Sequence, residues 1–512
     1  MRIESYWTAT TTQPRYPAYA GDGETDVAVI GGGIAGICTA YELARAGRQV
    51  TLLEADRILW GTTGHTTAKL TALHGFTYHT LSSSLGEQAA SRYAQSQLDA
   101  IGHVRATVDA LGIDCDLETR AAYSYVANGE DLDQVRQEVA AAATAGLSAE
   151  LVTDTGLPFR VAGAVRVPDQ AQFHPRRYLL GLAKELTRLG GQIYQGSRVV
   201  QLDPGSPCRL TTENGATLSA GHVVVATGFP VLDRLSVFSR LVPRRELVVA
   251  APIDPDADPD GMYLTYGERT RSVRTAPYGD GRRLLIVTGE VFRPGTADTN
   301  ERFEILERWV RERFGVPAVA YRWAAQDIGT TDRVPYVGGF PRGEGRIWLA
   351  TGFNGWGMTN GVMAGRLLAA LIADGAVPDW AKLYDPRRRH PTVEAGALLK
   401  AGTAVAGHLV GDRLSAGEAS DVTALEPGHG TVVVLDGELC AVHRDDAGGL
   451  HAVSATCTHM GCVVGFNPAE RTWDCPCHGS RFGVDGELLG GPAVEPLATR
   501  ENKLMAVDRA SS

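Results

Sequence analysis

The chain has 512 residues, more than one hydrophobic core normally serves, so we expect two or three domains. Its 44% apolar and 21% charged residues are typical of a globular protein, and a net charge of −10 argues against a surface built for nucleic acid or anionic membranes. The first residues lack the basic and apolar regions of a secretory signal. No run approaches the ~18 apolar residues of a membrane span, and we expect a cytoplasmic protein.

The N-terminal part of the chain begins with a polar segment and continues as an α/β pattern. Residues 1–25 are interrupted by glycine and proline, which predicts an arm on the surface. From residue 26 the apolar spacing first suits a buried parallel strand, then a helix, then a second strand. These elements form one βαβ unit, with strands at 27–30 and 50–53 and a helix at 34–44 that ends at Gly47.

The middle of the chain alternates between helical and strand-like segments. Three segments rich in Ala, Leu, Gln and Glu predict helices at 83–110, 131–145 and 175–189. A buried strand is predicted at 223–226, and a further strand and helix at 347–350 and 362–372. Between them, strand-like runs separated by turns suggest a separate antiparallel sheet, with strands at 247–251, 262–265 and 284–288.

The composition changes again after residue 385. Residues 386–419 open with a basic, proline-flanked break and continue as an Ala/Gly-rich stretch with a possible helix near 395–410, so we interpret them as a linker. Short strands such as 431–435 and 439–443 follow, separated by glycine turns. This pattern predicts a small all-β domain over 420–512.

A glycine-rich turn joins the first predicted strand to the first predicted helix. Gly31, Gly33 and Gly36 have the spacing G-x-G-x-x-G, which is informative because a strand precedes it and a helix follows. Gly31 allows a tight turn, Gly33 lets the backbone approach a pyrophosphate, and Gly36 lets the helix pack closely on the strand. The first turn of the helix, with Ile34 and Ala35, offers free N–H groups and a partial positive charge to such phosphates.

An acidic residue, Glu54, ends the second predicted strand, where it can accept hydrogen bonds from ribose hydroxyls. The alternative to a dinucleotide site is a glycine-rich turn without a ligand, and the matched context disfavours it. We find no second fingerprint of the kind that would bind NAD(P)H, because residues 223–228 lack its later glycines.

Residues 26–385 resemble the FAD-dependent amine and amino-acid oxidoreductases related to D-amino-acid and glycine oxidases. The segments that carry this resemblance are 26–36, Glu54, 61–65, 223–228 and 347–357 with the helix after it. The resemblance implies a Rossmann-type FAD-binding domain, built from about 26–82, 150–230 and 320–385. It also implies a substrate domain with a mixed sheet, built from about 83–149 and 231–319.

The same resemblance implies contacts with FAD. Thr62 and Thr63 would lie near the flavin pyrophosphate, the backbone of Val199 would meet the adenine, and Gly228 belongs to a matching segment. The groups expected near the isoalloxazine and ribityl parts are Gly352, Gly355, Trp356, Gly357 and Met358.

His65 has two interpretations. Residues 61–68 resemble the segment by which dimethylglycine-type dehydrogenases attach FAD covalently through a histidine. Those enzymes have an aromatic residue before the histidine, whereas this chain has Gly64, so we favour a polar His65 that lines the flavin pocket. Lys69, His74 and Arg274 are further candidates for that pocket. The Arg274 guanidinium can pair bidentately with a substrate carboxylate, and an exposed arginine on a loop is the alternative.

The C-terminal region contains a dense group of cysteines and histidines. Its spacing is C-x-H, then fifteen residues, then C-x-x-H, so each loop offers one thiol and one imidazole: Cys457, His459, Cys475 and His478. Zinc can use these ligand types, but C-x-H is closer than zinc ligand pairs usually are. A [2Fe–2S] cluster fits better, with thiolates on one iron and imidazoles on the other. Zinc or a purely structural role remains the alternative.

Residues 420–508 resemble Rieske domains, specifically those of the cytochrome bc complexes. The resemblance implies a disulfide between Cys462 and Cys477 that ties the two loops together. It also implies that the Ser480 hydroxyl bonds to a bridging sulfide and raises the reduction potential. The family tyrosine two residues later is Phe482 here, so we expect a potential below that of the high-potential members.

The whole chain resembles bacterial FAD oxidoreductases of the amine-oxidase class with a fused C-terminal Rieske domain. We therefore expect a flavin-dependent dehydrogenase that takes a hydride from the carbon next to the nitrogen of an amine or amino acid. Electrons would pass singly through the cluster to an external acceptor. In one alternative an external reductase charges the cluster and the flavin uses the electrons. In the other, the Rieske domain is a redox-sensing or docking module. A ring-hydroxylating oxygenase is disfavoured because the partner domain is a flavin fold.

Overall fold

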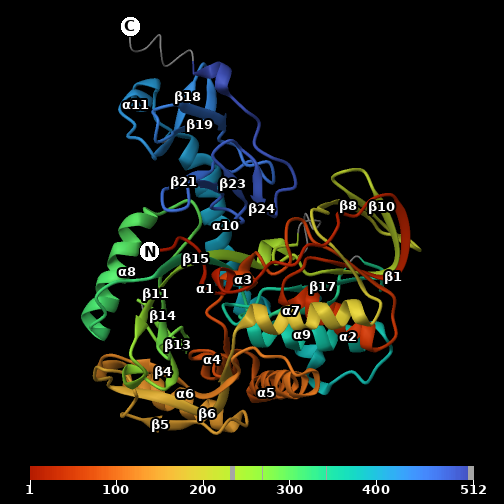
Figure 1. Cartoon of the computed structure of the whole chain (residues 1–512), viewed down its shortest axis with the longest axis vertical. Helices are drawn as coiled ribbons and strands as arrows, with labels where there is room; N and C mark the ends of the chain where they lie inside the picture. Colours follow the sequence, from red (N-terminus) through yellow and green to blue (C-terminus); the bar gives the residue numbers. More distant parts are fainter. Residues whose placement is uncertain (231–236, 268, 342, 415, 505–512) are drawn as a thin grey trace.

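The computed structural model describes residues 1–230, 237–267, 269–341, 343–414 and 416–504. A large body contains two sheets, and a small C-terminal domain lies above it in Figure 1, connected by the long helix α10 (Pro391–Leu414). The expected fold class, a Rossmann-type domain with a mixed-sheet domain and a small all-β domain, is confirmed. No helix in the described ranges combines the length and apolar character that a bilayer crossing requires.

The first sheet has the parallel core of a nucleotide-binding domain. Its strand order is β16-β17-β10-β1-β2-β7, and β9 and β8 extend it beside β10. The strands are β1 (Asp22–Ile30), β2 (Val50–Leu53), β7 (Gln192–Tyr194), β8 (Val199–Asp203), β9 (Cys208–Thr212), β10 (Thr217–Val225), β16 (Tyr336–Gly339) and β17 (Ile347–Thr351). The predicted βαβ unit is confirmed, because β1 and β2 pair in parallel on either side of α2 (Ile34–Arg45) in the chain.

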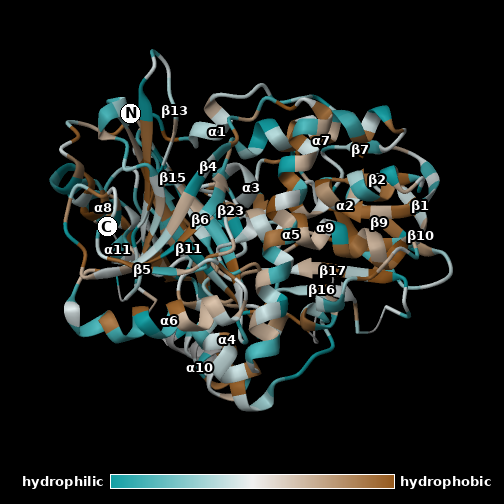
Figure 2. Ribbon diagram, turned by 90° about the horizontal axis from the view of Figure 1, so that it is seen from below, coloured by the Kyte–Doolittle hydropathy of each residue, from teal (hydrophilic) through white to brown (hydrophobic). Residues whose placement is uncertain are grey.

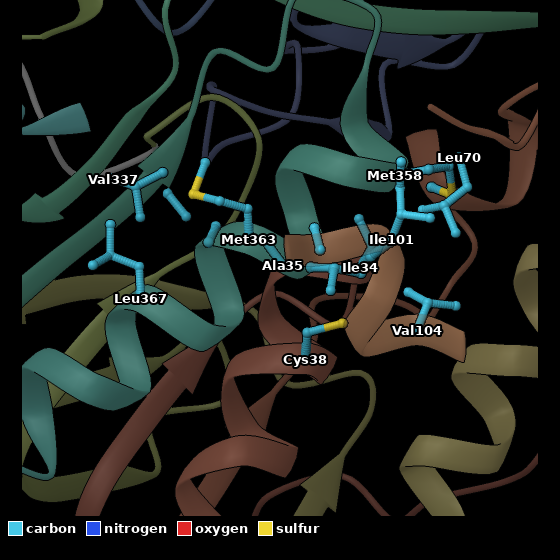
Figure 3. Packing of buried hydrophobic residues seen from close by; sticks show 14 of the residues in the cluster. Ile34, Ala35, Cys38, Leu70, Ile101, Val104, Val337, Met358, Met363 and Leu367 are labelled. Carbon is cyan, nitrogen blue, oxygen red and sulfur yellow. The ribbon is translucent and has the colours of Figure 1, made fainter. Parts of the chain in front are cut away.

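Helix α2 packs against α9 (Gly357–Ile372) and α7 (Pro175–Arg188) over one face of this sheet. Figure 3 shows Ile34 and Cys38 of α2 facing the core near Met363 of α9. Helices α2 and α9 approach so closely at Gly365 that a Cβ on this residue would lie only 2.6 Å from the Cβ of Cys38. This close packing holds the N-terminus of α2, and hence the glycine turn before it, in a fixed position.

The second sheet has nine strands in the order β15-β11-β14-β13-β12-β4-β6-β3, with β5 beside β6. It is mixed because β12 pairs in parallel with β4, whereas the other pairs are antiparallel. The strands are β3 (Lys69–Leu70), β4 (Glu118–Val126), β5 (Glu150–Val152), β6 (Gly163–Gln172), β11 (Leu241–Ile253), β12 (Gly261–Thr265), β13 (Ser272–Pro277), β14 (Arg283–Phe292) and β15 (Tyr321–Thr330).

The remaining helices pack against the sheets or against other helices. The helix expected at 83–110 is two helices, because Gly86 adopts a φ of +90° between them. The helices are α3 (Thr62–His65), α4 (Thr77–Leu85), α5 (Glu87–Leu111), α6 (Leu132–Thr144) and α8 (Thr299–Phe314). Short 3₁₀ turns lie at Gly129–Asp131, Phe238–Arg240, Pro255–Ala257, Asp379–Tyr384 and Glu501–Lys503. Figure 2 shows hydrophobic colour along inner strands and hydrophilic colour mostly on outer helices and loops.

Several segments lie where the sequence analysis did not expect them. The segments 26–82, 150–230 and 320–385 were expected in the FAD-binding domain, yet their strands β3, β5, β6 and β15 pair in the nine-stranded sheet. The N-terminal segment is not wholly on the surface, because α1 (Tyr6–Ala9) buries Tyr6 and Trp7 in a hydrophobic cluster. The Trp7 Nε1–H donates to the carbonyl of Thr66, which ties this segment to the chain after α3.

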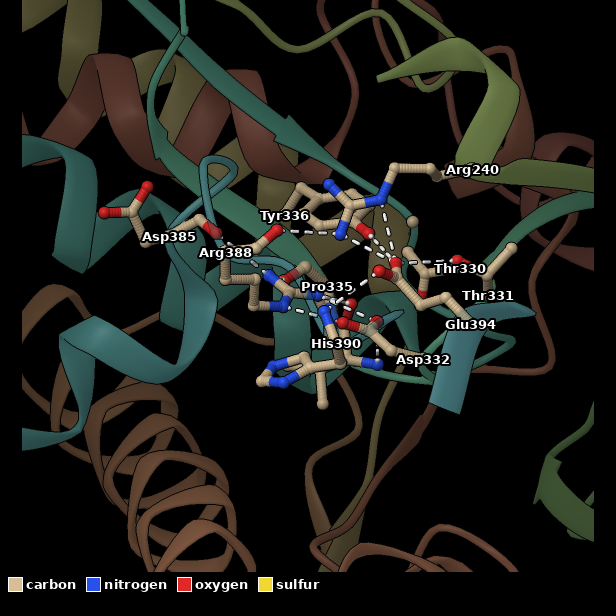
Figure 4. Close-up of polar contacts among 12 residues, drawn as sticks. Arg240, Thr330, Thr331, Asp332, Pro335, Tyr336, Asp385, Arg388, His390 and Glu394 are labelled. Carbon is tan, nitrogen blue, oxygen red and sulfur yellow. Dashed lines mark hydrogen bonds and ion pairs between the residues drawn. The ribbon is translucent and has the colours of Figure 1, made fainter. Parts of the chain in front are cut away.

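The start of the linker is anchored to the large body. Figure 4 shows Glu394, in the first turn of α10, accepting hydrogen bonds from Arg240 (2.8 Å) and Thr331 (3.0 Å). Arg388 pairs with Asp332 at 2.8 Å just before the helix. The linker is therefore a helix longer than the expected 395–410, fixed at its N-terminal end.

The C-terminal domain consists of two small antiparallel sheets. The first contains β18 (Gly430–Leu435), β19 (Glu438–Arg444) and β20 (Leu450–Ser454), and α11 (Ala419–Thr423) precedes it. The second contains β21 (Gly465–Asn467), β22 (Thr472–Asp474), β23 (Arg481–Gly483) and β24 (Leu488–Gly490). The cysteine- and histidine-bearing loops lie before β21 and between β22 and β23.

Candidate flavin and cluster sites

The glycine turn has a geometry that side chains would obstruct. Gly31 adopts a φ of +105°, and a Cβ there would lie 2.6 Å from the carbonyl oxygen of Ala226. A Cβ on Gly36 would lie 1.8 Å from the carbonyl oxygen of Gly31. The turn is therefore packed against its neighbours on the protein side, while Gly33 lines the adjoining cavity. This arrangement fits a dinucleotide phosphate at the N-terminus of α2.

Two side chains hold this turn in place. The Glu54 carboxylate accepts hydrogen bonds from the amides of Gly32 (2.7 Å) and Asp56 (3.0 Å). Burial raises the pKa of Glu54, and these amide bonds oppose that rise. The Thr63 hydroxyl accepts from the amide of Ile34 at 3.0 Å, so α3 is fixed against the N-terminus of α2.

A single cavity contains most of the residues predicted to contact FAD. Its wall includes Gly31, Gly33, Ile34, Ala35, Glu54, Thr62, Thr63, Val199, Gly228, Gly352, Gly355, Gly357 and Met358. Gly36 is not in the wall, since it packs against Gly31. Trp356 and His65 are not in the wall either.

His65 and Trp356 lie beside the cavity and contact other groups. The Nδ1 atom of His65 lies 2.9 Å from the carbonyl oxygen of Gly61, and burial lowers the pKa of His65. The Trp356 ring stacks on His74 with centroids 4.4 Å apart. His74 bonds to the Tyr93 hydroxyl at 2.7 Å, and burial lowers its pKa to about 3, so its ring is neutral at neutral pH.

Lys69 and Arg274 lie deeper in the protein, outside the cavity wall. The Lys69 ammonium donates to the carbonyl of Tyr263 at 2.6 Å, and burial, reinforced by the nearby Arg274 cation, lowers its pKa to about 7. The Arg274 guanidinium is 1% exposed and donates to the backbone carbonyls of Ala68 (2.6 Å) and Thr275 (3.0 Å). Arg274 is therefore neither on an exposed loop nor placed to bind a substrate carboxylate in the cavity.

Two carboxylates that the sequence analysis missed lie in the cavity wall, Glu246 of β11 and Asp327 of β15. Glu246 pairs with Ala325, which also lines the cavity. Asp327 lies two residues after Ala325 on β15 and therefore on the same face of the strand. Asp327 pairs with Arg244 at 2.9 Å, whereas Glu246 accepts a hydrogen bond from Thr288 at 3.2 Å. The available sequence signal was an acidic residue within each of two largely apolar segments, 241–253 and 321–330.

In the C-terminal domain the two loops bring the predicted cluster ligands together. Cys457 and Cys475 are buried free thiols, and the His459 and His478 rings have centroids 5.0 Å apart. The Nδ1 atom of His478 is buried and has no hydrogen-bond partner among the described residues. A desolvated nitrogen beside two buried thiols fits an iron site, which would supply the missing partner.

A disulfide joins Cys462 to Cys477 and so ties the two loops together. The Cys475 sulfur lies within 4.8 Å of both, which on distance alone suggests a three-cysteine metal group. Because Cys462 and Cys477 are bonded to each other, only Cys475 of the three offers a thiolate.

Ser480 and Phe482 lie on the inner side of the second loop. The Ser480 hydroxyl lies within hydrogen-bonding reach of the Cys457 sulfur and accepts from the amide of Ala493 at 3.0 Å. Phe482 is fully buried in the small hydrophobic core of the domain, where it pairs with Trp473. The hydroxyl is thus placed to donate to the sulfur side of the cluster.

The large body covers the histidine side of the cluster site. The rings of Phe229 and Phe238 lie 5.5 and 5.4 Å from the ring of His478. Gln326, which lines the flavin cavity, donates from Nε2 to the carbonyl of Gly479 at 2.9 Å. The cavity wall and the cluster loop are therefore in direct contact.

Buried charges fasten the two domains beside this contact. Arg245 of β11 pairs with Glu470 and with Asp474, the latter at 3.7 Å. Arg481 pairs with the same two carboxylates at 3.1 and 3.2 Å. Nearby, the Thr299 hydroxyl donates to the side-chain oxygen of Asn467 at 2.7 Å. This group of Arg245, Glu470, Asp474 and Arg481 is called the docking network below.

Comparisons with known proteins agree with both sites. Residues 26–371 match the FAD dependent oxidoreductase family, and residues 414–501 match the Rieske [2Fe-2S] domain. The "Putative Rieske 2Fe-2S iron-sulfur protein YhfW" of Bacillus subtilis is 34% identical over 96% of this chain and 97% of its own length. Gamma-glutamylputrescine oxidoreductase of Escherichia coli is 26% identical over 69% of this chain and 84% of its own.

Among solved structures, glycine oxidase from Geobacillus kaustophilus superposes with a TM-score of 0.59 at 21% identity, over 72% of this chain and 99% of its own. The expected cofactors, FAD and a [2Fe–2S] cluster, are those of the two matched families. The chain therefore belongs to the FAD-dependent oxidoreductase family and carries a C-terminal Rieske domain.

Proposed function

We propose that this oxidoreductase is a dehydrogenase of an amine or amino acid that delivers its electrons through the Rieske cluster to an external acceptor. The flavin, when bound, accepts two electrons with a hydride, and the cluster exchanges one electron at a time. The observation that supports the relay most directly is the Gln326–Gly479 hydrogen bond, which joins the flavin cavity wall to the loop of His478.

In this proposal the FAD contacts are the cavity-wall residues named above, with Glu54 at the ribose. Cys457, Cys475, His459 and His478 hold the irons. The Cys462–Cys477 disulfide keeps their two loops at a fixed separation. Phe229 and Phe238 exclude water from the histidine side, so that transfer within the chain does not compete with solvent.

The substrate class is proposed from the carboxylates of the cavity. Glu246 has no ion-pair partner among the described residues, whereas Asp327 forms an ion pair with Arg244. An unpaired carboxylate in a partly buried cavity favours a positively charged amine. Similar proteins include a gamma-glutamylputrescine oxidoreductase and two glycine oxidases, whose names denote an amine and an amino acid.

Anaerobic stopped-flow mixing of the holoenzyme with a panel of amines and amino acids tests this function. A substrate should bleach the flavin, and the electron paramagnetic resonance signal of the reduced cluster should then appear. As a control, Cys475→Ser removes a cluster ligand and should leave flavin bleaching while the cluster signal is lost. If the flavin of the wild-type protein bleaches and the cluster signal never appears, the relay is wrong.

The same experiment separates the two alternatives. If no substrate reduces the resting enzyme and an external reductase charges the cluster, electrons flow inward. If Cys475→Ser keeps full turnover with an artificial acceptor and changes only how that turnover is regulated, the Rieske domain is a sensing or docking module.

A further inference from the structure

The wall of the flavin cavity comes from both domains. Besides the glycine turn of the large body, it contains five residues of the Rieske domain: Leu489, Gly490, Gly491, Ala493 and Val494. Residues 488–494, which comprise β24 and the loop after it, are called the strap below. The strap has no counterpart in the nucleotide-binding fold, because it lies more than 100 residues beyond the region matched to the FAD family.

The two ends of the strap are held by different parts of the molecule. At its start, the Arg198 guanidinium donates to the carbonyl of Leu488 at 3.4 Å, and Arg198 precedes Val199 in the cavity wall. At its end, the amide of Ala493 donates to the Ser480 hydroxyl at 3.0 Å. The strap therefore runs along the cavity from the Val199 side to the cluster loop.

The strap has a composition suited to covering a dinucleotide. Gly490 and Gly491 present backbone without side chains, so the chain can approach a ligand closely. Val494 adds an apolar surface, and Ala493 is packed in the core of the Rieske domain. The docking network and the Thr299–Asn467 bond are largely buried, so the strap is fixed in this position by the whole interface.

We propose that the FAD-binding site spans both domains, with the strap in contact with the bound dinucleotide, so that tight FAD binding requires the docked Rieske domain. FAD binding and docking then stabilise each other, since each favours the same arrangement of the chain. This inference concerns only the binding of FAD. It does not depend on the substrate or on the direction of electron flow, and it stands or falls separately from the proposed function.

A substitution in the strap tests the contact in the full-length protein. Val494→Trp places a large ring in the cavity wall, and the control Glu495→Trp places the same ring on the adjacent exposed residue outside the wall. FAD is removed and titrated back, and its dissociation constant is measured by flavin fluorescence. We expect Val494→Trp to bind FAD at least tenfold more weakly and Glu495→Trp to bind it as the wild type does. The Rieske resonance signal reports whether each variant is folded.

Hydrogen exchange of the wild-type chain provides a second measurement. FAD loading should slow amide exchange in residues 488–494 and leave the exposed turn at 445–449 unchanged. If Val494→Trp loses the Rieske signal as well, this exchange measurement decides the question. The proposal is overturned if a folded Val494→Trp variant keeps wild-type affinity, or if exchange in the strap does not respond to FAD.

Discussion

Replacing Arg245 with methionine removes a central cation from the docking network. Arg245 is 1% exposed and pairs with Glu470 and Asp474 of the Rieske domain. Arg481 remains beside both carboxylates. The variant Arg245→Met therefore leaves two largely buried carboxylates to share one cation, in an interface that excludes most water.

Removing one partner of a buried charged group costs about 3–5 kcal/mol, because the remaining charge loses compensation. Since Arg481 still pairs with both carboxylates, we expect the lower end, about 3 kcal/mol. That free energy weakens the docking equilibrium roughly 100-fold. With urea dependences of about 1–3 kcal/mol per molar, it lowers the unfolding midpoint of the Rieske domain by about 1–3 M.

The assay is a urea titration of the full-length holoenzyme, with cluster absorbance reporting the Rieske domain and flavin fluorescence reporting the large body. The matched control is Arg471→Met, which removes a neighbouring arginine whose pair with Asp446 is 51% and 68% exposed. Such exposed pairs contribute about 0–1 kcal/mol. If the Rieske midpoint of Arg245→Met equals that of Arg471→Met, the docking network does not hold the domains together.

Four further outcomes are expected. Burial raises the pKa of Glu470, but Arg245 and Arg481 outweigh it and hold that pKa below its ordinary value, so the Rieske urea midpoint should fall as the pH drops below about 4.3. Ser480→Ala removes a hydrogen bond to a charged sulfur, and such bonds contribute about 1.5–3 kcal/mol. A redox titration should therefore show a reduction potential of the cluster that is lower by about 60–130 mV. Cys462→Ser opens the loop closed with Cys477, whose sequence separation is 15, and should cost about 3 kcal/mol, measured as earlier thermal loss of the cluster. Gly36→Ala forces its Cβ onto the carbonyl of Gly31, and the purified protein should lack FAD.

Three of these outcomes have a matched control variant. Glu470→Gln should remove the acid dependence of the midpoint, and an unchanged dependence would assign it to another group. Cys440→Ala alters a buried cysteine outside the disulfide and should lose far less thermal stability than Cys462→Ser. Gly102→Ala lies on α5 with open space around it and should keep its FAD. If Ser480→Ala leaves the potential unchanged, its hydroxyl does not donate to the cluster.

The local parts of the fold were predictable because their signals lie within short segments. The β1–α2–β2 unit follows from apolar spacing and from glycines that turn the chain sharply, and the structure confirms it. The partners of strands were less predictable. Strand pairing joins residues far apart in the chain, so the segments 150–230 and 320–385 were assigned to the FAD-binding domain although their strands β6 and β15 pair in the nine-stranded sheet. Tyr6 was expected on the surface because its neighbours are polar, yet its contacts are with distant aromatic rings.

The sites show the same division. The cysteine and histidine spacing is local, and the structure brings those side chains together. Arg274 was a candidate for binding the substrate carboxylate, because the sequence around an arginine does not show which groups it contacts. In the structure it donates to backbone carbonyls from three segments of the chain. The docking of Arg245 on Glu470 depends on complementarity between two folded surfaces, and no sequence pattern describes it.

Helix α10 has a consequence for how the chain tolerates insertions. Its first turn is fixed by Glu394 on Arg240, and near its end Arg413 donates to the carbonyl of Gly461, in the first cluster loop, at 2.8 Å. A continuous helix advances about 1.5 Å and turns about 100° per residue. One inserted residue would therefore swing the Rieske domain by more than a quarter turn, whereas seven would nearly restore its angular phase while displacing it by about 10 Å. Helix α10 therefore sets both the distance and the rotation between the large body and the Rieske domain, so its length is constrained as well as the contacts at its two ends.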